Sequence, residues 1–384
     1  MKIAIVSETF LPSTDGVVTR LTASIDWLQK QGHELLIIAP DLGVKEYRGI
    51  QVVGLPAHRF FLYPDRQLSW PSRQVGKSLR MFQPDLVHVV NPAVLGVAGV
   101  YYSWKWNYPL VASYHTRIPQ YADYYGLPFF KPVLWWYFRL LHNRADLNLC
   151  TSQTVYEELT AKRFRNVHVW KRGVDIERFG PEHYDEGMRH RLTGGQTEKT
   201  LLLYVGRLAP EKEIGQIRDV LQTHPDMCLA IVGDGPERQL LEDHFKGMNV
   251  VFTGFLHGQE LAQAYASSDV FVFPSTTETL GLVILEAMAS GLPVVAARSG
   301  PSCEQIEDGV TGCLFDPEEK GSLSKAVLKL NDHRYREQIS RNAYEVGRRF
   351  GWAEPSAQLL HFYQQVLEKR LVSTNNLDNR RMNG

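Results

Sequence analysis

Two glutamates separated by seven residues, Glu278 and Glu286, are the positions at which this sequence most clearly indicates chemistry. The apolar run 269–273 precedes them and stops at a proline, and a second apolar run, 293–297, follows them. This order predicts a strand, a loop that carries Glu278, a short helix that contains Glu286, and another strand. An isolated pair at this spacing is usually a solvated helix face. The predicted helix is otherwise apolar, however, and an unpaired carboxylate there is unfavourable, so we expect both glutamates to bind a ligand.

The start of that helix adds a second kind of ligand-binding group. It is predicted near Leu280, Gly281 and Leu282, and the first N–H groups of a helix lack partners within it. Such groups hold anionic or hydroxyl-rich ligands. Because one carboxylate precedes the helix and the other lies inside it, they can accept hydrogen bonds from two different sets of hydroxyls. This arrangement suits a sugar and a ribose on either side of a pyrophosphate.

Two cations follow another predicted strand. Arg207 and Lys212 come directly after the apolar run 201–205. Basic side chains just past the carboxyl end of a parallel strand can bind a diphosphate at the crevice of the sheet. Alone they could be surface cations; beside the glutamate pair we interpret them as functional. The segment 233–236 ends the next predicted strand, and a nucleotide contact and a plain turn are equally good interpretations of it.

The first half of the chain offers three further candidates. Gly16 joins the first predicted strand to the first predicted helix, where the missing Cβ lets backbone N–H groups reach a phosphate. It is not part of a G-x-G-x-x-G fingerprint, which weakens a dehydrogenase interpretation. His115 and Arg117 follow the apolar run 110–112. A single histidine is usually structural, but one at a strand terminus is a better candidate for function.

Alternating strand-like and helix-like segments must position these residues. The alternation predicts βα units and largely parallel sheets in both halves, and 384 residues suit two α/β domains. The expected domains are residues 1–180 and 198–350, joined by a polar, glycine-bearing linker. A helical segment, 351–372, is expected to return to the first domain, and 373–384 to form a disordered tail. In the first half we expect strands at 3–6, 35–38, 86–90 and 110–112 and a helix at 19–31; in the second half we expect strands at 201–205, 229–232, 250–252, 270–273 and 293–297.

The charge distribution and the cysteine content indicate the partners and the cellular compartment to expect. The net charge is zero, but residues 1–180 carry 21 Lys and Arg against 14 Asp and Glu, and the remainder carries 21 against 28. A basic first half favours an anionic partner such as a membrane surface or an acidic substrate, unless the asymmetry is ordinary scatter. Four cysteines without C-x-x-C spacing indicate free thiols in a reducing compartment. The most apolar helix candidate, 93–104, is too short to span a bilayer.

Aromatic residues are concentrated in one segment. Residues 101–138 hold 15 of the 42 Phe, Trp and Tyr, together with Lys105, Arg117 and Lys131 against a single acid, Asp123. Core packing explains some of them. Trp and Tyr beside Lys are typical of the bilayer interface, and they would equally suit an apolar acceptor pocket. Both interpretations predict contact with a lipid.

Over residues 1–370 the chain resembles the retaining glycosyltransferases of the GT-B fold, family 4. The resemblance implies an α/β protein with two Rossmann-like domains facing a central cleft, the first binding the acceptor and the second the nucleotide sugar. The family's motifs fall on Glu278 and Glu286, on Arg207 and Lys212, on Gly16 and on His115. Its N-G-V-D segment is similar to residues 172–175, with Arg172 in place of the asparagine.

The resemblance also implies a role for each residue. Glu286 would bind the ribose hydroxyls, Glu278 the sugar hydroxyls, and Arg207 with Lys212 the leaving diphosphate. No side chain is an evident nucleophile, which fits front-face substitution in which the donor phosphate helps to deprotonate the acceptor. No metal cluster is evident, and the Arg/Lys pair would replace a divalent cation. No cofactor is expected beyond the nucleotide sugar, which is a substrate.

Residues 170–175 and 278–283 look like the sulfolipid synthase subgroup, whose members transfer sulfoquinovose from a UDP donor to diacylglycerol in photosynthetic membranes. The implied partners are UDP-sulfoquinovose, diacylglycerol and a membrane surface, without nucleic acid, and the implied location is cytoplasmic and peripheral on the membrane. A sulfonate is a permanent anion, so its pocket should contain cations. The candidates are His115, Arg117, Lys171 and Arg172, although Lys171 and Arg172 could also be a solvated pair.

Three alternatives remain open. A lipid glycosyltransferase that moves glucose or mannose from a UDP or GDP donor to diacylglycerol or phosphatidylinositol would share every motif. A nucleotide-sugar epimerase of the same fold would lack the aromatic acceptor segment. A non-catalytic protein that binds UDP-sugars would not need both glutamates and both cations.

Overall fold

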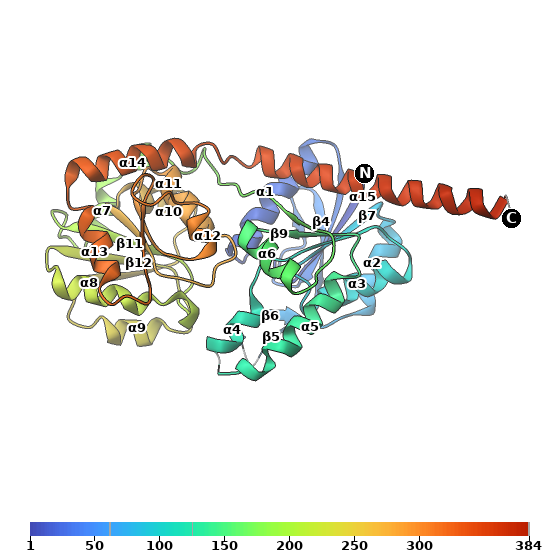
Figure 1. Cartoon of the computed structure of the whole chain (residues 1–384), viewed down its shortest axis with the longest axis horizontal. Helices are drawn as coiled ribbons and strands as arrows, with labels where there is room; N and C mark the ends of the chain where they lie inside the picture. Colours follow the sequence, from blue (N-terminus) through green and yellow to red (C-terminus); the bar gives the residue numbers. More distant parts are fainter. Residues whose placement is uncertain (61–62, 125, 383–384) are drawn as a thin grey trace. The chain divides into compact units, whose positions relative to one another are not determined.

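The chain folds into two compact units in a computed structural model that describes residues 1–60, 63–124 and 126–382 (Figure 1). Unit 1 comprises Met1–Lys171 and the chain from Trp352 onward, and unit 2 comprises Arg172–Gly351. The division therefore falls at residue 171, whereas the sequence analysis ended the first domain at 180. Among the described residues, no helix combines the length and the apolar composition that a membrane crossing requires.

The segment 180–198, expected to be a linker, is folded into unit 2. It contains η2 (Pro181–His183) and α7 (Glu186–Leu192). Met188 and Leu192 are buried in the core of unit 2, and the Asp185 carboxylate caps α7 by accepting the N–H of Met188. The segment is polar overall, so the sequence analysis did not identify these two apolar residues at helical spacing as core residues.

Unit 1 is built on an eight-stranded sheet in which every pair of neighbouring strands is parallel except β3 and β4. The strand order is β10-β9-β8-β7-β1-β2-β4-β3, so the first strand lies between β2 and β7. A separate hairpin pairs β5 with β6. The strands are β1 (Lys2–Ser7), β2 (Glu34–Pro40), β3 (Glu46–Tyr47), β4 (Ile50–Leu55), β5 (Ala57–Phe60), β6 (Tyr63–Ser69), β7 (Leu86–Val90), β8 (Leu110–Ser113), β9 (Leu147–Cys150) and β10 (Val167–Val169).

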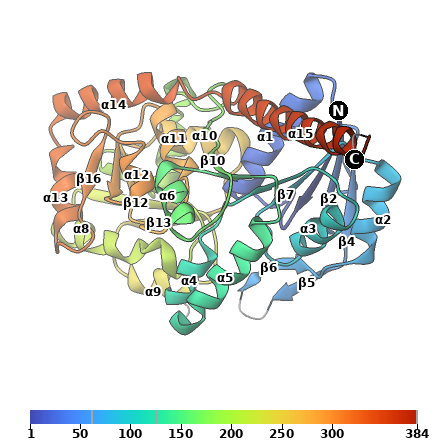
Figure 2. The same ribbon diagram turned by 45° about the vertical axis from the view of Figure 1, so that its right-hand side comes forward.

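Helices cover both faces of this sheet, which is why its strands are continuously apolar. Ile3 and Ile5 of β1 pack with α1 and α15, and Ala4 and Val6 pack on the other face with α2 and α3. Figure 2 shows α2 and α3 side by side. The helices are α1 (Gly16–Lys30), α2 (Arg73–Phe82), α3 (Gly96–Lys105), α4 (Ile118–Tyr124), η1 (Pro128–Phe130), α5 (Lys131–His142), α6 (Gln153–Ala161) and α15 (Ala353–Met382).

Helix α15 belongs to unit 1 although it ends the chain. Leu359, Phe362, Tyr363 and Val366 follow helical spacing and are buried against the sheet beside α1. The structure continues the helix to Met382, where the sequence analysis expected a disordered tail from residue 373. The polar composition of 373–382 is compatible with a helical backbone that extends the anchored part. Residues 383 and 384 of the expected tail lie outside the described residues.

Unit 2 has a six-stranded parallel sheet in the order β13-β12-β11-β14-β15-β16. The strands are β11 (Thr200–Val205), β12 (Met227–Val232), β13 (Val250–Gly254), β14 (Val270–Phe273), β15 (Val294–Ala297) and β16 (Cys313–Phe315). The remaining helices are η3 (Pro210–Lys212), η4 (Ile214–Ile217), α8 (Arg218–Thr223), α9 (Arg238–His244), α10 (Gly258–Ala266), α11 (Leu282–Ala289), α12 (Gly300–Cys303), α13 (Ser322–Lys329) and α14 (His333–Gly347). Alternate residues of β11 enter the two cores on opposite faces of the sheet.

The strand orders confirm two Rossmann-like domains. In unit 2 the first strand of the sheet, β11, lies between the second, β12, and the fourth, β14. This order reverses direction between β11 and β14, and ligands of open α/β sheets bind at such a reversal, beyond the carboxyl ends of the strands. In unit 1 the same reversal lies between β1 and β7.

Candidate active site

The loops that leave β11 and β14 border the reversal point of unit 2, and they carry three of the predicted residues. Arg207 lies in the loop after β11, Lys212 ends η3 in the same connection, and Glu278 lies in the loop between β14 and α11. The parallel pairing of β11 with β14 brings the carboxyl ends of both strands to one edge of the sheet. A cation-bearing loop and a carboxylate-bearing loop therefore meet there.

Hydroxyl groups hold these two loops together. Ser275 Oγ and Thr277 Oγ1 both donate to the carbonyl oxygen of Glu211, at 3.1 and 3.2 Å. Between them, Thr276 Oγ1 donates to Glu213 Oε1 at 3.2 Å. The residues on either side of Lys212 are thus tied to the segment that precedes Glu278, Glu211 through its backbone and Glu213 through its carboxylate. This preorganises the site, because a ligand does not have to order the two loops.

Lys212 and Glu278 form a largely buried ion pair through Nζ and Oε1, with side chains 14% and 19% exposed. Burial alone would lower the pKa of the Lys212 ammonium, but the charge and hydrogen bond of Glu278, with smaller contributions from Tyr204 and Glu211, together raise this pKa. The ammonium therefore stays charged at neutral pH. A diphosphate that binds here would share Lys212 with Glu278, and Glu278 would keep an oxygen for a sugar hydroxyl.

Glycines let the loops after β11 and β12 approach one another. Gly206 has φ of +156° and Gly233 has φ of +133°. A Cβ on Gly233 would lie 1.9 Å from the carbonyl oxygen of Gly206, so no other residue fits there. The Arg207 carbonyl accepts a hydrogen bond from the Tyr204 hydroxyl at 3.1 Å. The close approach of the Gly206 backbone therefore explains why residue 233, at the start of segment 233–236, is a glycine.

Glu286 lies inside α11, where the other side chains are mostly buried. Burial raises the pKa of Glu286 to about 7, although the Tyr265 hydroxyl donates to its Oε2 at 2.8 Å and Arg178 adds a favourable charge. This carboxyl therefore titrates closer to neutral pH than an exposed glutamate does. A ribose that donates two hydroxyls to the carboxylate would favour the ionised form.

Helix α11 begins after Gly281, whose φ of +68° places it in the left-handed region. Within the described part of the chain, no side chain caps the first turn of α11. Gln305 Nε2 donates to the Leu280 carbonyl and 3.2 Å away to that of Pro301, which holds the turn before Leu282. The first turn of α11 therefore remains a candidate for ligand binding through its backbone N–H groups.

In unit 1, His115 follows β8 and is 8% exposed. Its Nε2 lies 2.9 Å from Ser113 Oγ, which lies 2.9 Å from His88 Nε2, and His88 Nδ1 lies 2.7 Å from the Tyr363 hydroxyl on α15. Burial lowers the pKa of His115 well below its ordinary value, and the Arg20 charge lowers it further. His115 is therefore a neutral imidazole held by a buried polar chain.

Arg20 is a buried cation that the sequence analysis did not select. It is 1% exposed, its guanidinium lies 3.7 Å from the centre of a Trp170 ring, and its Nη2 donates to the carbonyls of Trp170 and Lys171 at 2.7 and 2.6 Å. His115 also packs against Trp170. Burial lowers the pKa of Arg20 to about 9, so it remains charged at neutral pH. Its only signal in the sequence is an arginine on the apolar side of a helix.

Two further candidates in unit 1 have protein partners. The Asp15 carboxylate accepts the N–H groups of Val17 and Val18, both at 3.0 Å, so the helix start at Gly16 is capped by the protein itself. Arg117 Nε lies 3.1 Å from Glu158 Oε2. Neither contact excludes a ligand, but a phosphate at Gly16 would compete with Asp15.

Arg172 begins unit 2 and is part-buried. Its Nη2 donates to the Glu304 carbonyl at 2.7 Å, and its guanidinium lies 5.4 Å from the Phe350 ring centre. Burial lowers its pKa, while the Glu304 carboxylate raises it. Neighbouring Lys171, in unit 1, pairs with Glu354 at 2.5 Å. The two adjacent cations thus have different surroundings, and Arg172 is the less solvated one.

The structure therefore brings Lys212 and Glu278 into contact and carries Arg207 and Glu286 on the adjoining loop and helix of unit 2. Gly16, His115 and Arg117 lie in unit 1. The sequence analysis missed Tyr265, which binds Glu286 from α10, and Glu211, whose carbonyl joins the two loops. Neither has a signal in the sequence, because both act through contacts between distant segments.

Comparison with known proteins identifies the relatives of this chain. The sequence pattern of the family described as "Glycosyltransferase Family 4" matches residues 14–178, and that of "Glycosyl transferases group 1" matches residues 190–346. A sulfoquinovosyl transferase of Arabidopsis thaliana, SQD2, is 36% identical over 353 residues, which are 90% of this chain and 69% of that protein. A GDP-mannose-dependent alpha-mannosyltransferase of Mycobacterium tuberculosis is 37% identical over 377 residues, 96% of this chain and 98% of that protein.

The fold is shared with solved structures of lower identity. The crystal structure of Anabaena HepE in complex with UDP-glucose superimposes with a TM-score of 0.79 at 23% identity, covering 95% of this chain and all of that one. The chain belongs to glycosyltransferase family 4. It is a hexosyltransferase that uses a nucleotide sugar, with the GT-B fold.

Proposed function

We propose that the protein transfers sulfoquinovose from UDP-sulfoquinovose to diacylglycerol with retention of the anomeric configuration. The observation that carries the transfer itself is the Lys212–Glu278 pair at the reversal point of unit 2, with Glu286 in the following helix. The choice of sugar is supported by the 36% identity to a sulfoquinovosyl transferase.

In this proposal the charges of unit 2 stabilise the leaving group. The bond between the anomeric carbon and the diphosphate breaks, and the acceptor hydroxyl oxygen forms the new bond on the same face. Its proton passes to the departing phosphate oxygen. Arg207 and Lys212 stabilise the negative charge that develops on the diphosphate, which is usually the largest catalytic contribution. They take the place of a divalent cation, so turnover should be unchanged in EDTA; a requirement for added Mg²⁺ would refute this part.

Each of the other proposed contacts binds a different part of the donor. Glu286 accepts from the ribose hydroxyls and Glu278 from the sugar hydroxyls, while the N–H groups of Leu280, Gly281 and Leu282 face the diphosphate. In unit 1 the neutral His115 can accept or donate a hydrogen bond with a sugar hydroxyl, but it brings no charge. Gly16 is proposed to contact the donor through its backbone.

Recognition of the sulfonate is proposed to depend on Arg172. A pocket for a permanent anion needs a cation that has no carboxylate as its main partner. Arg172 donates to a main-chain carbonyl, whereas Arg117 pairs with Glu158 and Lys171 with Glu354. Arg172→Asn should therefore reduce kcat/KM for UDP-sulfoquinovose about 10-fold or more, and hardly change it for UDP-glucose. Arg117→Ala tests the weaker candidate. Equal losses on the two donors, or none, would place sulfonate recognition elsewhere.

The acceptor is proposed to be a membrane lipid. Aromatic side chains of the segment 101–138 divide into two groups: Trp135 and Phe138 are buried, but Trp104, Phe129 and Trp136 are 54–68% exposed. Exposed large aromatics suit the bilayer interface, where a lipid acceptor would be collected. The protein is accordingly proposed to act at a membrane surface.

The main competing function is mannosyl transfer from GDP-mannose, because the mycobacterial mannosyltransferase is 37% identical and matches along its whole length. Glucosyl transfer to diacylglycerol would need the same residues. The deciding experiment offers UDP-sulfoquinovose, UDP-glucose and GDP-mannose separately with diacylglycerol or phosphatidylinositol, and identifies products by mass spectrometry. Preference for GDP-mannose would overturn the proposed donor. Nucleotide-sugar binding without any turnover would instead indicate a non-catalytic protein.

A further inference from the structure

Helix α5 is apolar on two opposite sides, and the described residues cover one of them. Trp135, Phe138 and Leu141 are buried in the cores of unit 1. On the other side Val133, Trp136 and Leu140 recur at helical spacing and are 54%, 54% and 44% exposed, and Phe129 and Phe130 before the helix are 68% and 46% exposed. We call these last five residues the α5 stripe. A stripe of large apolar side chains at this exposure marks an interaction surface.

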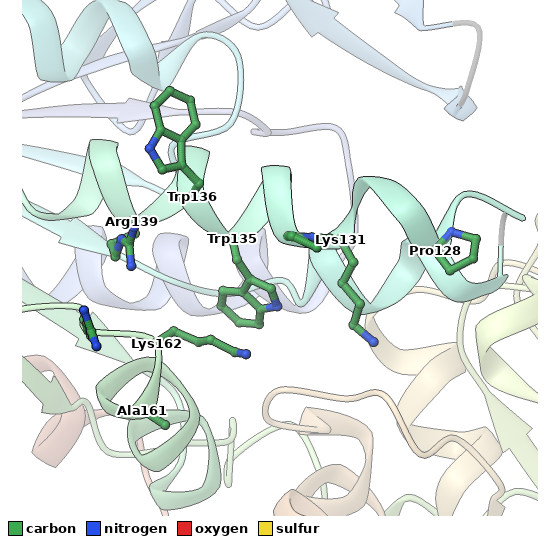
Figure 3. Close-up of a pocket in the computed structure, with 9 residues that line it drawn as sticks. Pro128, Lys131, Trp135, Trp136, Arg139, Ala161 and Lys162 are labelled. Carbon is green, nitrogen blue, oxygen red and sulfur yellow. The ribbon is translucent and has the colours of Figure 1, made fainter.

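A pocket of about 460 Å³ opens beside this stripe, between α5 and the turn that ends α6 (Figure 3). Its polar lining is basic: Lys131 and Arg139 come from α5, and Lys162 and Arg163 from the turn. Among the described residues, none that lines it is acidic. Lys131 and Lys162 extend toward the space beside the Trp135 ring, and the Lys162 ammonium lies 5.7 Å from the centre of that ring.

Hydrogen bonds join the two segments that line the pocket. Asn143, directly after α5, donates through Nδ2 to the Arg163 carbonyl at 3.1 Å and accepts the Arg165 N–H at 2.9 Å. This ties the basic turn to the end of α5. One of these cations, Lys131, pairs with Asp123 at 2.5 Å. Among the described residues, the lining of the pocket contains four cations and no acid, so it is net positive even with Asp123 counted.

We propose that this pocket binds the phosphate of an anionic phospholipid headgroup while the α5 stripe enters the interface of the bilayer. Lys and Arg side chains bind phosphate oxygens through charge-assisted hydrogen bonds. Trp and Phe side chains with basic neighbours are the composition of interfacial helices. A soluble anion would use the cations but leave the stripe in water. A lipid uses both, because its phosphate lies directly above an apolar region.

The inference rests on the proposed lipid acceptor for the presence of a membrane, but it concerns a different site and can fail separately. The headgroup phosphate is not consumed, and the residues of the pocket lie outside the groups assigned to the donor. Vesicle binding is measured without a nucleotide sugar. Its result is therefore independent of whether sugar is transferred to diacylglycerol.

The test compares two charge-matched double variants. Arg139→Gln/Lys162→Gln removes two cations of the pocket, and Lys30→Gln/Lys77→Gln removes two exposed lysines from α1 and α2 in the same unit. Binding is measured by flotation with phosphatidylcholine vesicles, with and without phosphatidylglycerol. We expect the pocket variant to bind the phosphatidylglycerol vesicles about 30-fold more weakly than wild type, and the lysine control to bind like wild type. Equal losses in both variants would mean general electrostatic attraction and would overturn the inference.

Two further measurements complete the test. One examines the role of the α5 stripe, and the other distinguishes a lipid phosphate from a soluble phosphate. Val133→Ser/Trp136→Ser should weaken binding to both kinds of vesicle, because it removes apolar area and no charge. Inorganic phosphate, followed by tryptophan fluorescence, should bind weakly and compete poorly with vesicles. Tight binding of inorganic phosphate that depends on Arg139 and Lys162, without vesicle binding, would identify a site for a soluble anion instead. If the pocket variant is unstable in thermal melting, Lys162→Gln/Arg163→Gln, in an exposed turn, replaces it with the same expectations.

Discussion

The two units share a fold but prepare their candidate residues in opposite electrostatic states. In unit 2 an ammonium and a carboxylate, Lys212 and Glu278, face each other at the end of the sheet, and burial raises the pKa of Glu286 to about 7. In unit 1 the candidate that follows a strand end is His115, beyond β8, a neutral imidazole in a chain of neutral groups. The difference shows that the shared fold sets where candidate residues lie, whereas the side chains themselves set the charge and the chemistry available there. In the proposed function, the charged groups of unit 2 bind the diphosphate and the neutral His115 of unit 1 contacts hydroxyl groups.

The largest effect should come from removing the cations of unit 2. Arg207→Ala/Lys212→Ala should lower kcat at least about 10³-fold, because the leaving diphosphate loses its charge stabilisation. Lys246→Ala/Arg334→Ala, at exposed positions of the same unit, is the matched control. Turnover and thermal melting are measured together, since loss of Lys212 leaves Glu278 without its ion-pair partner. The variant Lys212→Ala/Glu278→Gln should have a melting temperature closer to that of wild type and still be inactive. Near-normal turnover of Arg207→Ala/Lys212→Ala would refute the proposal that these cations stabilise the leaving diphosphate.

The two glutamates of unit 2 should differ from one another. Glu286→Gln should weaken UDP about 10-fold or more, because a hydroxyl loses a charged acceptor. Glu278→Gln should leave UDP binding unchanged or slightly tighter, since Lys212 then gives its whole charge to the diphosphate, while turnover of the sugar donor falls. Calorimetry with UDP distinguishes them, with exposed Glu345→Gln as control. Equal losses in both variants would show that the division between ribose and sugar is wrong.

The pH dependence of donor binding tests the ionisation of Glu286 in unit 2. The pKa of Glu286 is raised from 4.5 to about 7, so the carboxyl is protonated below that value and ionised above it. If the ionised form accepts the ribose hydroxyls, affinity for the nucleotide sugar should rise about 10-fold from pH 6 to pH 8. The nucleotide sugar is the suitable probe because its diphosphate, esterified at both ends, keeps its charge over this range. Glu286→Gln should abolish the dependence, and a profile that survives in this variant would assign it to another group.

The smallest effect concerns the neutral site of unit 1. Arg20→Gln should raise the pKa of His115 toward its ordinary value, because one of the charges that lower it is removed while burial remains. The titration of His115 can be followed by NMR. Arg20→Lys should retain the low pKa, and Arg73→Gln, at an exposed position on α2, should not change it. An unchanged His115 in Arg20→Gln would show that burial alone keeps the imidazole neutral.

Local sequence patterns were sufficient for the elements that carry the site. The apolar runs 86–90 and 270–273 predicted the bounds of β7 and β14, and the run before Glu278 with the helix around Glu286 predicted the loop and α11. Such signals are local, because a strand buried on both faces is a continuous apolar run and a buried carboxylate in an apolar helix is conspicuous. The same reasoning failed at 180–198, where a polar composition outweighed the apolar anchors Met188 and Leu192.

Contacts between distant segments were decided only by the tertiary structure. The ion pair of Lys212 with Glu278, the hydrogen bond of Tyr265 to Glu286, and the link from His115 through Ser113 and His88 to Tyr363 each join side chains that the sequence separates. The sequence by itself determined which groups are present and that two largely parallel sheets present them near strand ends. Burial and neighbouring charge determine the ionisation of each group, and these depend on which segments pack together, so no local pattern encodes them.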